Sequence, residues 1–297
     1  MSVVISPSDP GISSRAGPAS ARSGATHGIA DLRFRADAGT TRLAGLDQRA
    51  PLRALFPASA DDGLANAVLV TTTGGLVGGD RLDVRVIAGA GANVLVTAQA
   101  AEKVYRSLGA DCRVSIDLNA AEASWLEWLP QETILFEAAR LERTTRIDAA
   151  AGARVLAGDI LVFGRRARGE TLTQGRFRDA WQVHRAGRLV WADALAGAGD
   201  LAAVLAAPAC LAGAAAIATA IYLADDAAKL VTIVRDLTGE ADGGEMAVAV
   251  TCIAGVLIVR WLSRDARVLR SAFGRFWATF RRQVGGWTCA LPRVWCV

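Results

Sequence analysis

The chain has 297 residues, 52% of them hydrophobic and 21% charged, which is the balance of a globular protein with a sizeable core. Its formal net charge is +4, and among its 33 basic residues only Lys103 and Lys229 are lysine. No nucleic-acid-binding module accompanies this charge, so a nucleic-acid-binding protein is not expected. Abundant arginine suits protein interfaces, although codon composition explains the same bias equally well.

Histidine and cysteine are too sparse for several kinds of catalytic or metal site. The chain has two histidines, His27 and His184, and five cysteines without a C-x-x-C pair. A hydrolytic triad, a histidine-rich metal cage, a structural zinc site or a disulfide framework is therefore not indicated. We expect the cysteines to be buried free thiols.

The first segment, residues 1–27, is rich in serine, glycine, alanine and proline. We expect a disordered tail there, followed by a single β-rich domain over residues 28–297. The tail lacks the apolar stretch of a secretory signal peptide, although its arginines and serines leave a transit peptide open. A cytoplasmic protein is expected.

Residues 29–195 have the pattern of an all-β region. In residues 112–118 apolar and polar side chains alternate strictly, as they do in a half-buried strand. Glycines separate such segments at spacings typical of turns. The other segments of this kind are residues 82–86, 94–98, 124–129, 140–147, 154–163, 171–184 and 188–191. Since strands and helices do not alternate, we predict a mainly β fold and no doubly wound sheet.

The run TGGLVGGDRL concentrates glycine at Gly74, Gly75, Gly78 and Gly79 and continues with Asp80. Such glycines serve either a phosphate-binding loop or a tight turn. A phosphate-binding loop needs Lys-Ser/Thr after its last glycine, whereas Asp80 would direct a negative charge at the phosphate. The segment that follows alternates like a strand. We therefore predict a tight connection between strands that presents Asp80.

Residues 201–224 carry no charge and are long enough to span a membrane. Half of them are alanine, and Pro208 and Gly213 interrupt the run, so the driving force for insertion is weak. We expect no membrane span. A buried strand is predicted at residues 214–223, after a loop at Pro208.

Two helices are predicted in the last third of the chain, with strand-like residues 246–260 between them. The first begins at the N-cap Asp225 and ends at Gly239. The second begins at Ser263 and ends at Gly285-Gly286. Its apolar face consists of Leu269, Phe273, Phe276, Trp277, Phe280 and Val284. Its other faces are expected to carry most of Arg264, Arg267, Arg270, Arg275, Arg281 and Arg282, as a solvated surface or an interaction surface.

Three further segments contain more charge than strand packing requires, namely TAQAAEKVYRS, WLPQETILFE and LVFGRRARGE. Each alone is explained by surface ion pairs worth under about 1 kcal/mol. In the order TGGLVGGDRL, TAQAAEKVYRS, WLPQETILFE, LVFGRRARGE and a terminal LPRVW, the segments resemble the UreD (also called UreH) family of urease accessory proteins. The resemblance runs from about Pro51 to Val297.

The resemblance implies a cytoplasmic, non-catalytic scaffold of the nickel-insertion machinery. Its fold would be a large β-rich scaffold, β-helix-like or of stacked sheets, with about two helices near the C-terminal third. Such a protein binds a UreF-type partner and, through it, a UreG-type GTPase, and docks onto apo-urease; an internal water-filled tunnel is suggested for nickel. The sequence departs from the family pattern at Asp159, where glutamate is commoner, and at Ala138, where glycine usually follows the acid.

A nickel conduit needs ligands weak enough to release the ion, such as carboxylates, carbonyl oxygens and water. The candidate path residues are Asp80, Glu102, Glu132, Glu137, Asp159 and Glu170, each of which has an alternative as the partner of Arg81, Lys103, Arg106 or Arg168. Candidate structural or partner contacts are Gly74, Gly75, Gly78, Gly79, Lys103, Arg106, Arg165, Arg168, Arg267, Arg270 and Arg282.

We expect nickel in transit, no tightly bound cofactor and no high-affinity metal site. The expected partners are UreF-type and UreG-type proteins and apo-urease. An enzyme with an uncharacterised site and a membrane-associated β-rich protein remain as alternatives, although the sequence offers no convincing pair of nucleophile and base.

Overall fold

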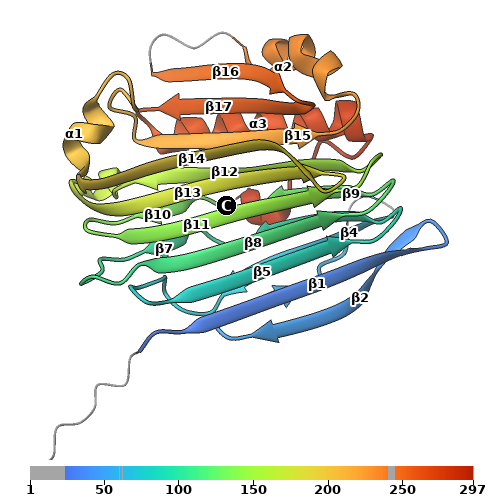
Figure 1. Cartoon of the computed structure of the whole chain (residues 1–297), viewed down its shortest axis with the longest axis horizontal. Helices are drawn as coiled ribbons and strands as arrows, with labels where there is room; N and C mark the ends of the chain where they lie inside the picture. Colours follow the sequence, from blue (N-terminus) through green and yellow to red (C-terminus); the bar gives the residue numbers. More distant parts are fainter. Residues whose placement is uncertain (1–23, 60, 62, 240–244, 297) are drawn as a thin grey trace, which may run out of the picture.

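The computed structural model describes residues 24–59, 61, 63–239 and 245–296. Within these residues it contains two stacked β-sheets and three α-helices (Figure 1). The predicted mainly β, stacked-sheet fold is therefore confirmed. Most of the predicted tail, residues 1–23, lies outside the described residues, and the first strand begins at His27.

Each sheet is a continuous ladder of strands. The first sheet has the order β14 (Arg188–Asp200), β13 (Gln174–Arg185), β11 (Arg140–Ala149), β8 (Cys112–Ala120), β5 (Arg81–Ala88), β1 (His27–Asp37) and β2 (Thr40–Arg49). The second has the order β16 (Met246–Ile253), β17 (Val256–Ser263), β15 (Ala216–Leu223), β12 (Arg154–Phe163), β9 (Trp125–Leu129), β6 (Asn93–Ala98), β4 (Leu64–Thr71) and β3 (Leu52–Leu55).

The chain winds between the two sheets like a solenoid. Strands β4, β6, β9 and β12 of the second sheet alternate along the chain with β5, β8, β11 and β13 of the first. Within each of these sets neighbouring strands are parallel. Two short strands, β7 (Glu102–Val104) and β10 (Thr133–Leu135), branch from the second sheet, because β10 pairs with β12 and β7 pairs with β10.

The main core lies between the sheets. On β5, Leu82 and Val84 point inward and are 4% and 5% exposed, whereas Arg81 and Arg85 face solvent. This alternation follows from the period of two along a strand. The outer face of the first sheet is therefore polar, as the alternating segments predict.

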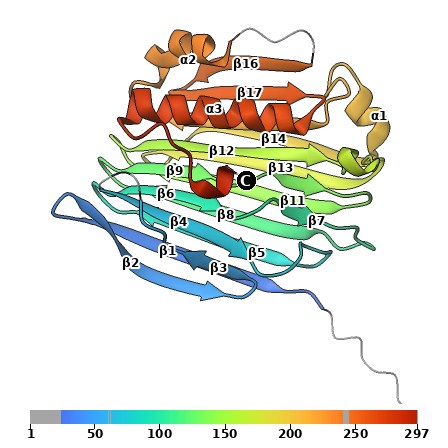
Figure 2. The same ribbon diagram turned by 180° about the vertical axis from the view of Figure 1, so that it is seen from behind.

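A second core lies on the opposite face of the second sheet, under helix α3 (Ala266–Gly285), as Figure 2 shows. The predicted apolar side of this helix is confirmed, since Leu269, Phe273 and Trp277 are fully buried. The side chain of Asp265, not of Ser263, accepts hydrogen bonds from the first helical N–H groups. Gly286 ends the helix with a φ of +76°.

The connection before α3 differs in part from the predictions. Strand β15 matches the expected buried strand, but a short helix, α1 (Leu201–Ala206), precedes the loop at Pro208. Helix α2 (Val231–Thr238) follows a 3-10 turn, η2 (Ala227–Leu230), and ends before Gly239. Asp225 is not its N-cap, because that carboxylate pairs with Arg185 instead. The strand-like residues 246–260 form the hairpin of β16 and β17.

Two predictions concern the environment of particular segments. Cys112 is buried and Cys252 is half-buried, but Cys210, Cys289 and Cys296 are exposed, so the expectation of buried thiols is wrong for the last three. Their sites are a loop and the C-terminal segment, where little packs over a small side chain. Among the helices in the described residues, none has both the length and the apolar character that a membrane span requires.

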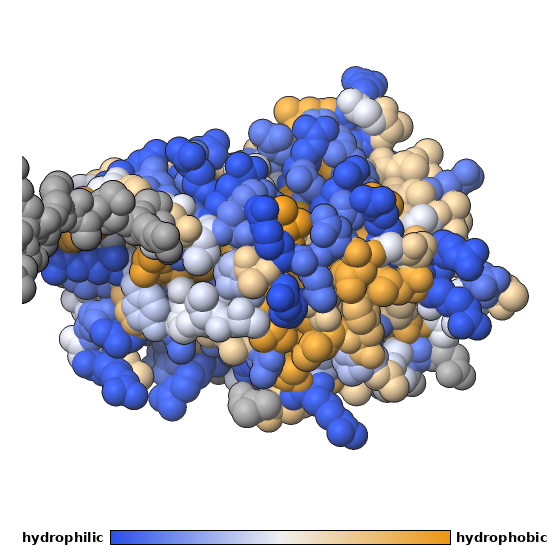
Figure 3. Space-filling view, turned by 90° about the horizontal axis from the view of Figure 1, so that it is seen from below, coloured by the Kyte–Doolittle hydropathy of each residue, from blue (hydrophilic) through white to orange (hydrophobic). Residues whose placement is uncertain are grey.

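The end of the stack formed by β1, β2 and β3 carries several apolar side chains at its surface (Figure 3). Leu43 and Leu46 of β2 are each 40% exposed, and Leu55 of β3 is 55% exposed. Strands β2 and β3 are the edges of their sheets. Among the described residues no helix covers this end, in contrast to the face under α3.

Candidate functional site

The four internal motifs lie at one edge of the stack, which we call the motif edge. Each contains or adjoins a crossing from the second sheet to the first, at residues 72–80, 99–111, 130–139 and 164–173. The crossings start 27, 31 and 34 residues apart (72, 99, 130 and 164). A recurrent strand, turn and strand at this spacing is the signal by which their stacking could have been found from the sequence.

The glycine loop packs directly against the second crossing. Leu76 donates its N–H to the carbonyl of Lys103 (2.7 Å) and accepts from the N–H of Tyr105 (2.8 Å). Gly75 has a φ of +148°, and a Cβ atom there would lie 2.6 Å from the Lys103 oxygen. The predicted tight connection between strands is confirmed, because the loop joins β4 to β5.

Asp80 closes this loop. Its carboxylate accepts from the backbone N–H groups of Val77 (2.9 Å) and Thr26 (2.7 Å), and the side chain of Thr26 is a third donor (3.0 Å). The residue is 3% exposed. Arg81 pairs with Asp83 at 2.9 Å, so the considered pair of Asp80 and Arg81 does not form.

Glu137 and Glu170 join the third crossing to the fourth. Glu137 accepts from the N–H and the hydroxyl of Thr173, both at 2.6 Å, and from the N–H of Gln174 at 3.2 Å. Glu170 accepts from the N–H of Glu137 (3.1 Å) and pairs with Arg165. The hydrogen bond from Arg165 lowers the pKa of Glu170. These carboxylates therefore satisfy donors within the turns.

A cavity of about 280 Å³ lies between the sheets beside the motif edge; we call it the inner cavity. Glu102 and Asp159 line it, together with Arg143, Thr71 and Thr133. The hydroxyl of Thr71 donates to Glu102 Oε2 at 2.6 Å. Burial raises the pKa of Glu102.

Arg143 holds a buried cluster of charges at the wall of the inner cavity. It donates to Asp179 through Nε (2.7 Å) and Nη2 (2.6 Å), to Asp159 through Nη2 (2.6 Å) and to Thr133 through Nη1 (3.0 Å). The three charged side chains are 6% to 8% exposed. Burial and the neighbouring Asp179 raise the pKa of Asp159 to about 8, against the attraction of Arg143. Burial therefore favours the protonated form of Asp159.

Sequence reasoning missed Arg143 and Asp179. Both occupy inward positions of alternating strands, where Leu141 and Phe177 are their buried neighbours on the same face. A charged residue at an inward position is the signal that could have marked them, because a buried charge needs a partner.

A second hollow, which we call the outer pocket, has a volume of about 510 Å³. It shares Gln99, Ala100, Ala101 and Gln131 with the lining of the inner cavity. Arg270 of α3 donates to Glu132 at 3.1 Å and to the side-chain oxygen of Gln131 at 2.7 Å. Glu132 thus lies in the outer pocket, on the other side of a shared wall from Glu102 and Asp159.

The C-terminal segment, residues 286–296, completes this wall. The amide of Gln131 donates to the carbonyl of Val294 at 2.9 Å, and Arg270 donates to the carbonyl of Trp295 at 3.2 Å. The indole of Trp295 donates to the hydroxyl of Thr97 at 3.1 Å. The terminal LPRVW motif is therefore attached to the third of the internal motifs.

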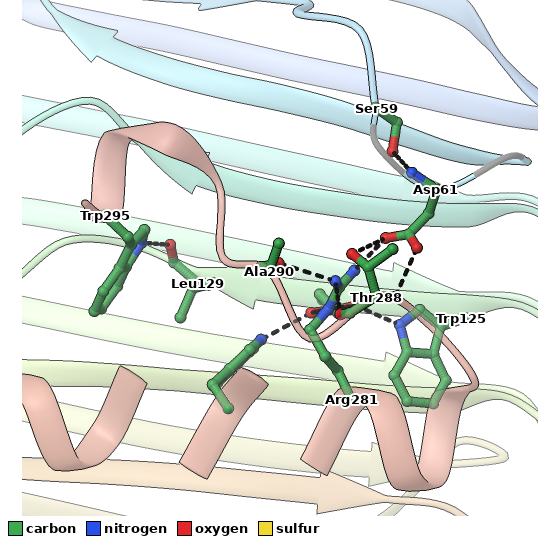
Figure 4. A network of polar contacts seen from close by, with 10 residues as sticks. Ser59, Asp61, Trp125, Leu129, Arg281, Thr288, Ala290 and Trp295 are labelled. Carbon is green, nitrogen blue, oxygen red and sulfur yellow. Dashed lines mark hydrogen bonds and ion pairs between the residues drawn. The ribbon is translucent and has the colours of Figure 1, made fainter. Parts of the chain in front are cut away.

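Farther along α3, the polar network in Figure 4 attaches the C-terminal segment to α3 and to β9. Glu127 is fully buried and accepts from the indoles of Trp125 and Trp277 (2.8 Å each) and from Arg281 (3.1 Å). Arg281 also donates to Asp61 (3.2 Å) and to a carbonyl of the segment. The expectation that Arg281 belongs to a solvated face is wrong, since it is 2% exposed. Burial raises the pKa of Glu127 despite Arg281.

Of the remaining candidate residues, Gly74, Gly75 and Lys103 line the inner cavity, and Arg267 lines the outer pocket. Within the described residues, none of the six candidate acids forms a salt bridge with Arg81, Lys103, Arg106 or Arg168. Arg165 lies over the Phe136 ring at 4.2 Å. Lys103, Arg106 and Arg168 are exposed. The candidate acids thus divide into Glu102, Asp159 and Glu132 at the hollows and Asp80, Glu137 and Glu170 in the turns.

The metal-binding capacity of the site is limited in the part of the chain that the structure describes. No group of three or more His, Cys, Asp or Glu side chains there is arranged to hold an ion. The absence of a high-affinity site stays a prediction. Single carboxylates with retained water are the ligands this arrangement offers.

The chain is similar to proteins of one family over nearly its whole length. Residues 26–296 match the family model described as UreD urease accessory protein. A urease accessory protein UreD of Magnetococcus marinus is 46% identical over 90% of this chain and 93% of its own length. A urease accessory protein UreD of Rhodopseudomonas palustris (strain HaA2) is 43% identical over 88% of this chain and 90% of its own length. The UreD 3 protein of Bradyrhizobium sp. (strain BTAi1) is 42% identical over 86% of this chain and 92% of its own length.

Proposed function

This chain belongs to the UreD family of urease accessory proteins, and from that premise we propose that it is a cytoplasmic, non-catalytic scaffold for nickel insertion into urease. In this proposal it binds a UreF-type partner, through it a UreG-type GTPase, and apo-urease. Its similar relatives are named as accessory proteins, which is consistent with a role other than catalysis.

The observation that carries the proposal is the convergence of three acids on two adjoining hollows. Glu102 and Asp159 line the inner cavity, Glu132 lies in the outer pocket, and Gln131 belongs to both linings. We propose that nickel passes along this route as cargo. The choice of nickel as the ion rests on the family, and the route is supported by the carboxylates that line the two hollows.

The chemistry of these acids suits transfer better than storage. Each of the three carboxylates already accepts a hydrogen bond, from Thr71, Arg143 or Arg270. A cation must compete with those donors, so binding is weak and release is fast. Burial also raises the pKa of Glu102, so a proton competes with a cation more strongly there than at an exposed carboxylate.

The test is activation of apo-urease in cells that co-express this chain with UreF-type and UreG-type proteins. We expect Glu102→Gln and Asp159→Asn to lower the nickel content of urease several-fold while the accessory complex still assembles. The matched control is Glu142→Gln, because Glu142 is on the same strand as Arg143 but has its side chain 37% exposed.

The possible outcomes distinguish the scaffold function from the nickel route. If the native chain neither assembles with the partners nor activates urease, the scaffold function is wrong. If it does both, and the cavity variants load urease with as much nickel as the control, the scaffold function stands and the route is wrong.

A further inference from the structure

Helix α3 carries a row of exposed arginines on the side opposite its buried face. We call Arg267, Arg275 and Arg282 the arginine stripe; all three are exposed, as is Ser271 between them. At about 100° per residue the four side chains lie within an arc of about 80°. With a rise of about 1.5 Å per residue, the stripe is about 22 Å long.

The charge of this row is not balanced within its own part of the chain. Residues 266–296 contain six arginines and neither an acid nor a lysine. Two of these arginines are neutralised inside the protein, Arg270 by Glu132 and Arg281 by Glu127. Among the described residues, the stripe has one ion pair, between Arg267 Nη2 and the carboxylate of the N-cap Asp265 at 3.7 Å. The Arg267 side chain is nevertheless 93% exposed.

Stability of the helix explains only part of the stripe, because the helix dipole favours a cation such as Arg282 in the last turn. A cation in the first turn is opposed by the helix dipole, so Arg267 is unfavourable where it stands. The outer face of the first sheet has exposed arginines too, but they stand beside acids there: Arg33 pairs with Asp31 (3.0 Å) and Arg113 with Glu142 (3.5 Å). Among the described residues, Arg275 and Arg282 have no such acid beside them, and Arg267 has only the N-cap Asp265.

We propose that the arginine stripe docks a partner protein through an acidic surface about 22 Å long, with carboxylates spaced along it. This inference rests on the scaffold function proposed above and names the chemistry of the partner surface. The guanidinium groups form bidentate pairs with those carboxylates. The docked partner lies beside the outer pocket, since Arg267 and Ser271 also line that hollow.

The setting favours a protein over a nucleic acid as the occupant. The stripe is bordered by the apolar Val268, which is 38% exposed, and by a pocket that can take a side chain. The net charge of the chain is only +4, and the part of the exposed helix face around the stripe offers no aromatic ring for stacking on bases.

The experiment compares two sets of charge reversals in the full chain. The triple variant R267E/R275E/R282E reverses the stripe, and R33E/R85E/R113E reverses three exposed arginines on the outer face of the first sheet. Affinity for the co-expressed UreF-type protein, and separately for the UreG-type protein and apo-urease, is measured at several salt concentrations. Circular dichroism checks that each variant is folded, and arginine-to-glutamine variants replace any that is not.

We expect the stripe variant to bind one of these partners roughly tenfold or more weakly, and the native complex to weaken as salt rises. The sheet variant should bind as the native chain does. If the native chain and the stripe variant bind all three proteins equally well, the proposal that the stripe docks a partner is wrong, while the scaffold function stands. Binding of the stripe to duplex DNA or anionic vesicles, with all three proteins bound unchanged, would also overturn it. Failure of the native chain to bind any of the three would overturn both proposals.

Discussion

Two groups of carboxylates at the motif edge have contrasting surroundings. Asp80 and Glu137 each accept three hydrogen bonds, two from backbone N–H groups and one from a threonine hydroxyl. Glu102 and Asp159 instead line the inner cavity, and burial raises the pKa of both. The same residue type, equally prominent in the motifs, therefore has two different physical roles.

The difference teaches how to assign these acids. A carboxylate that satisfies backbone donors holds the fold together. A carboxylate that the protein keeps desolvated beside a cavity is held at a cost to stability, which calls for a functional reason. Removing the first kind should therefore lower stability, and removing the second should lower nickel transfer.

The strongest test of this contrast is Asp80→Ala. The change leaves the N–H groups of Val77 and Thr26 without their acceptor in a site that is 3% exposed. We expect the free energy of unfolding to fall by about 3 kcal/mol. Urea unfolding measures it, and Glu142→Ala on the outer face of the first sheet should cost under about 1 kcal/mol. Equal losses in the two variants would contradict the structural role of Asp80.

Glu137→Ala should have a somewhat smaller effect of the same kind. Glu137 is half-buried, so water can replace part of what Thr173 and Gln174 lose. We expect a loss of about 2 kcal/mol in urea unfolding. If Glu137→Ala is as stable as the native protein but fails to activate urease, Glu137 belongs with the cavity acids, and the division drawn here is wrong.

Much of the secondary structure could be predicted from local patterns. The segment 154–163 was predicted with the bounds that β12 has, and the apolar face of α3 was predicted residue by residue. Strand alternation and helical spacing act over a few residues, so they are legible in one sequence. The pairing of strands is not local, because neighbours such as β8 and β11 come from crossings about 30 residues apart.

The division among the acids could not be predicted for the same reason. Arg281 and Glu127 are 154 residues apart in the chain, and Arg143 and Asp179 are 36 apart. On α3, Arg270 and Arg281 flank the apolar side, whereas Arg267 faces solvent, and sequence spacing alone does not tell which flank meets a buried acid. The motifs identify the family without showing which acids face the cavity.

The pH dependence of stability tests the raised pKa of Asp159, one of the two acids that line the inner cavity. The pKa of Asp159 is raised to about 8 from the usual 3.8, so between these values the folded protein holds a proton that the unfolded chain releases. This contribution to stability is present at low pH and is lost as the pH rises toward 8, by at most about 1.4 kcal/mol per pH unit. Relative to the native protein, Asp159→Asn should therefore gain stability from pH 5 to pH 8. A difference that stays constant over this range would contradict the raised pKa.

The smallest expected effect concerns the backbone beside Glu137. Ala138 has a φ of +57°, in the left-handed region that glycine adopts without a steric penalty, and its N–H donates to the carbonyl of Gln174 at 3.0 Å. Ala138→Gly should therefore raise the free energy of unfolding by about 0.5 to 1 kcal/mol. The control is Ala139→Gly, at a neighbouring position whose φ is not positive and whose methyl group is buried; it should lose stability. If both variants lose stability, the turn that places Glu137 against Thr173 is not strained at Ala138.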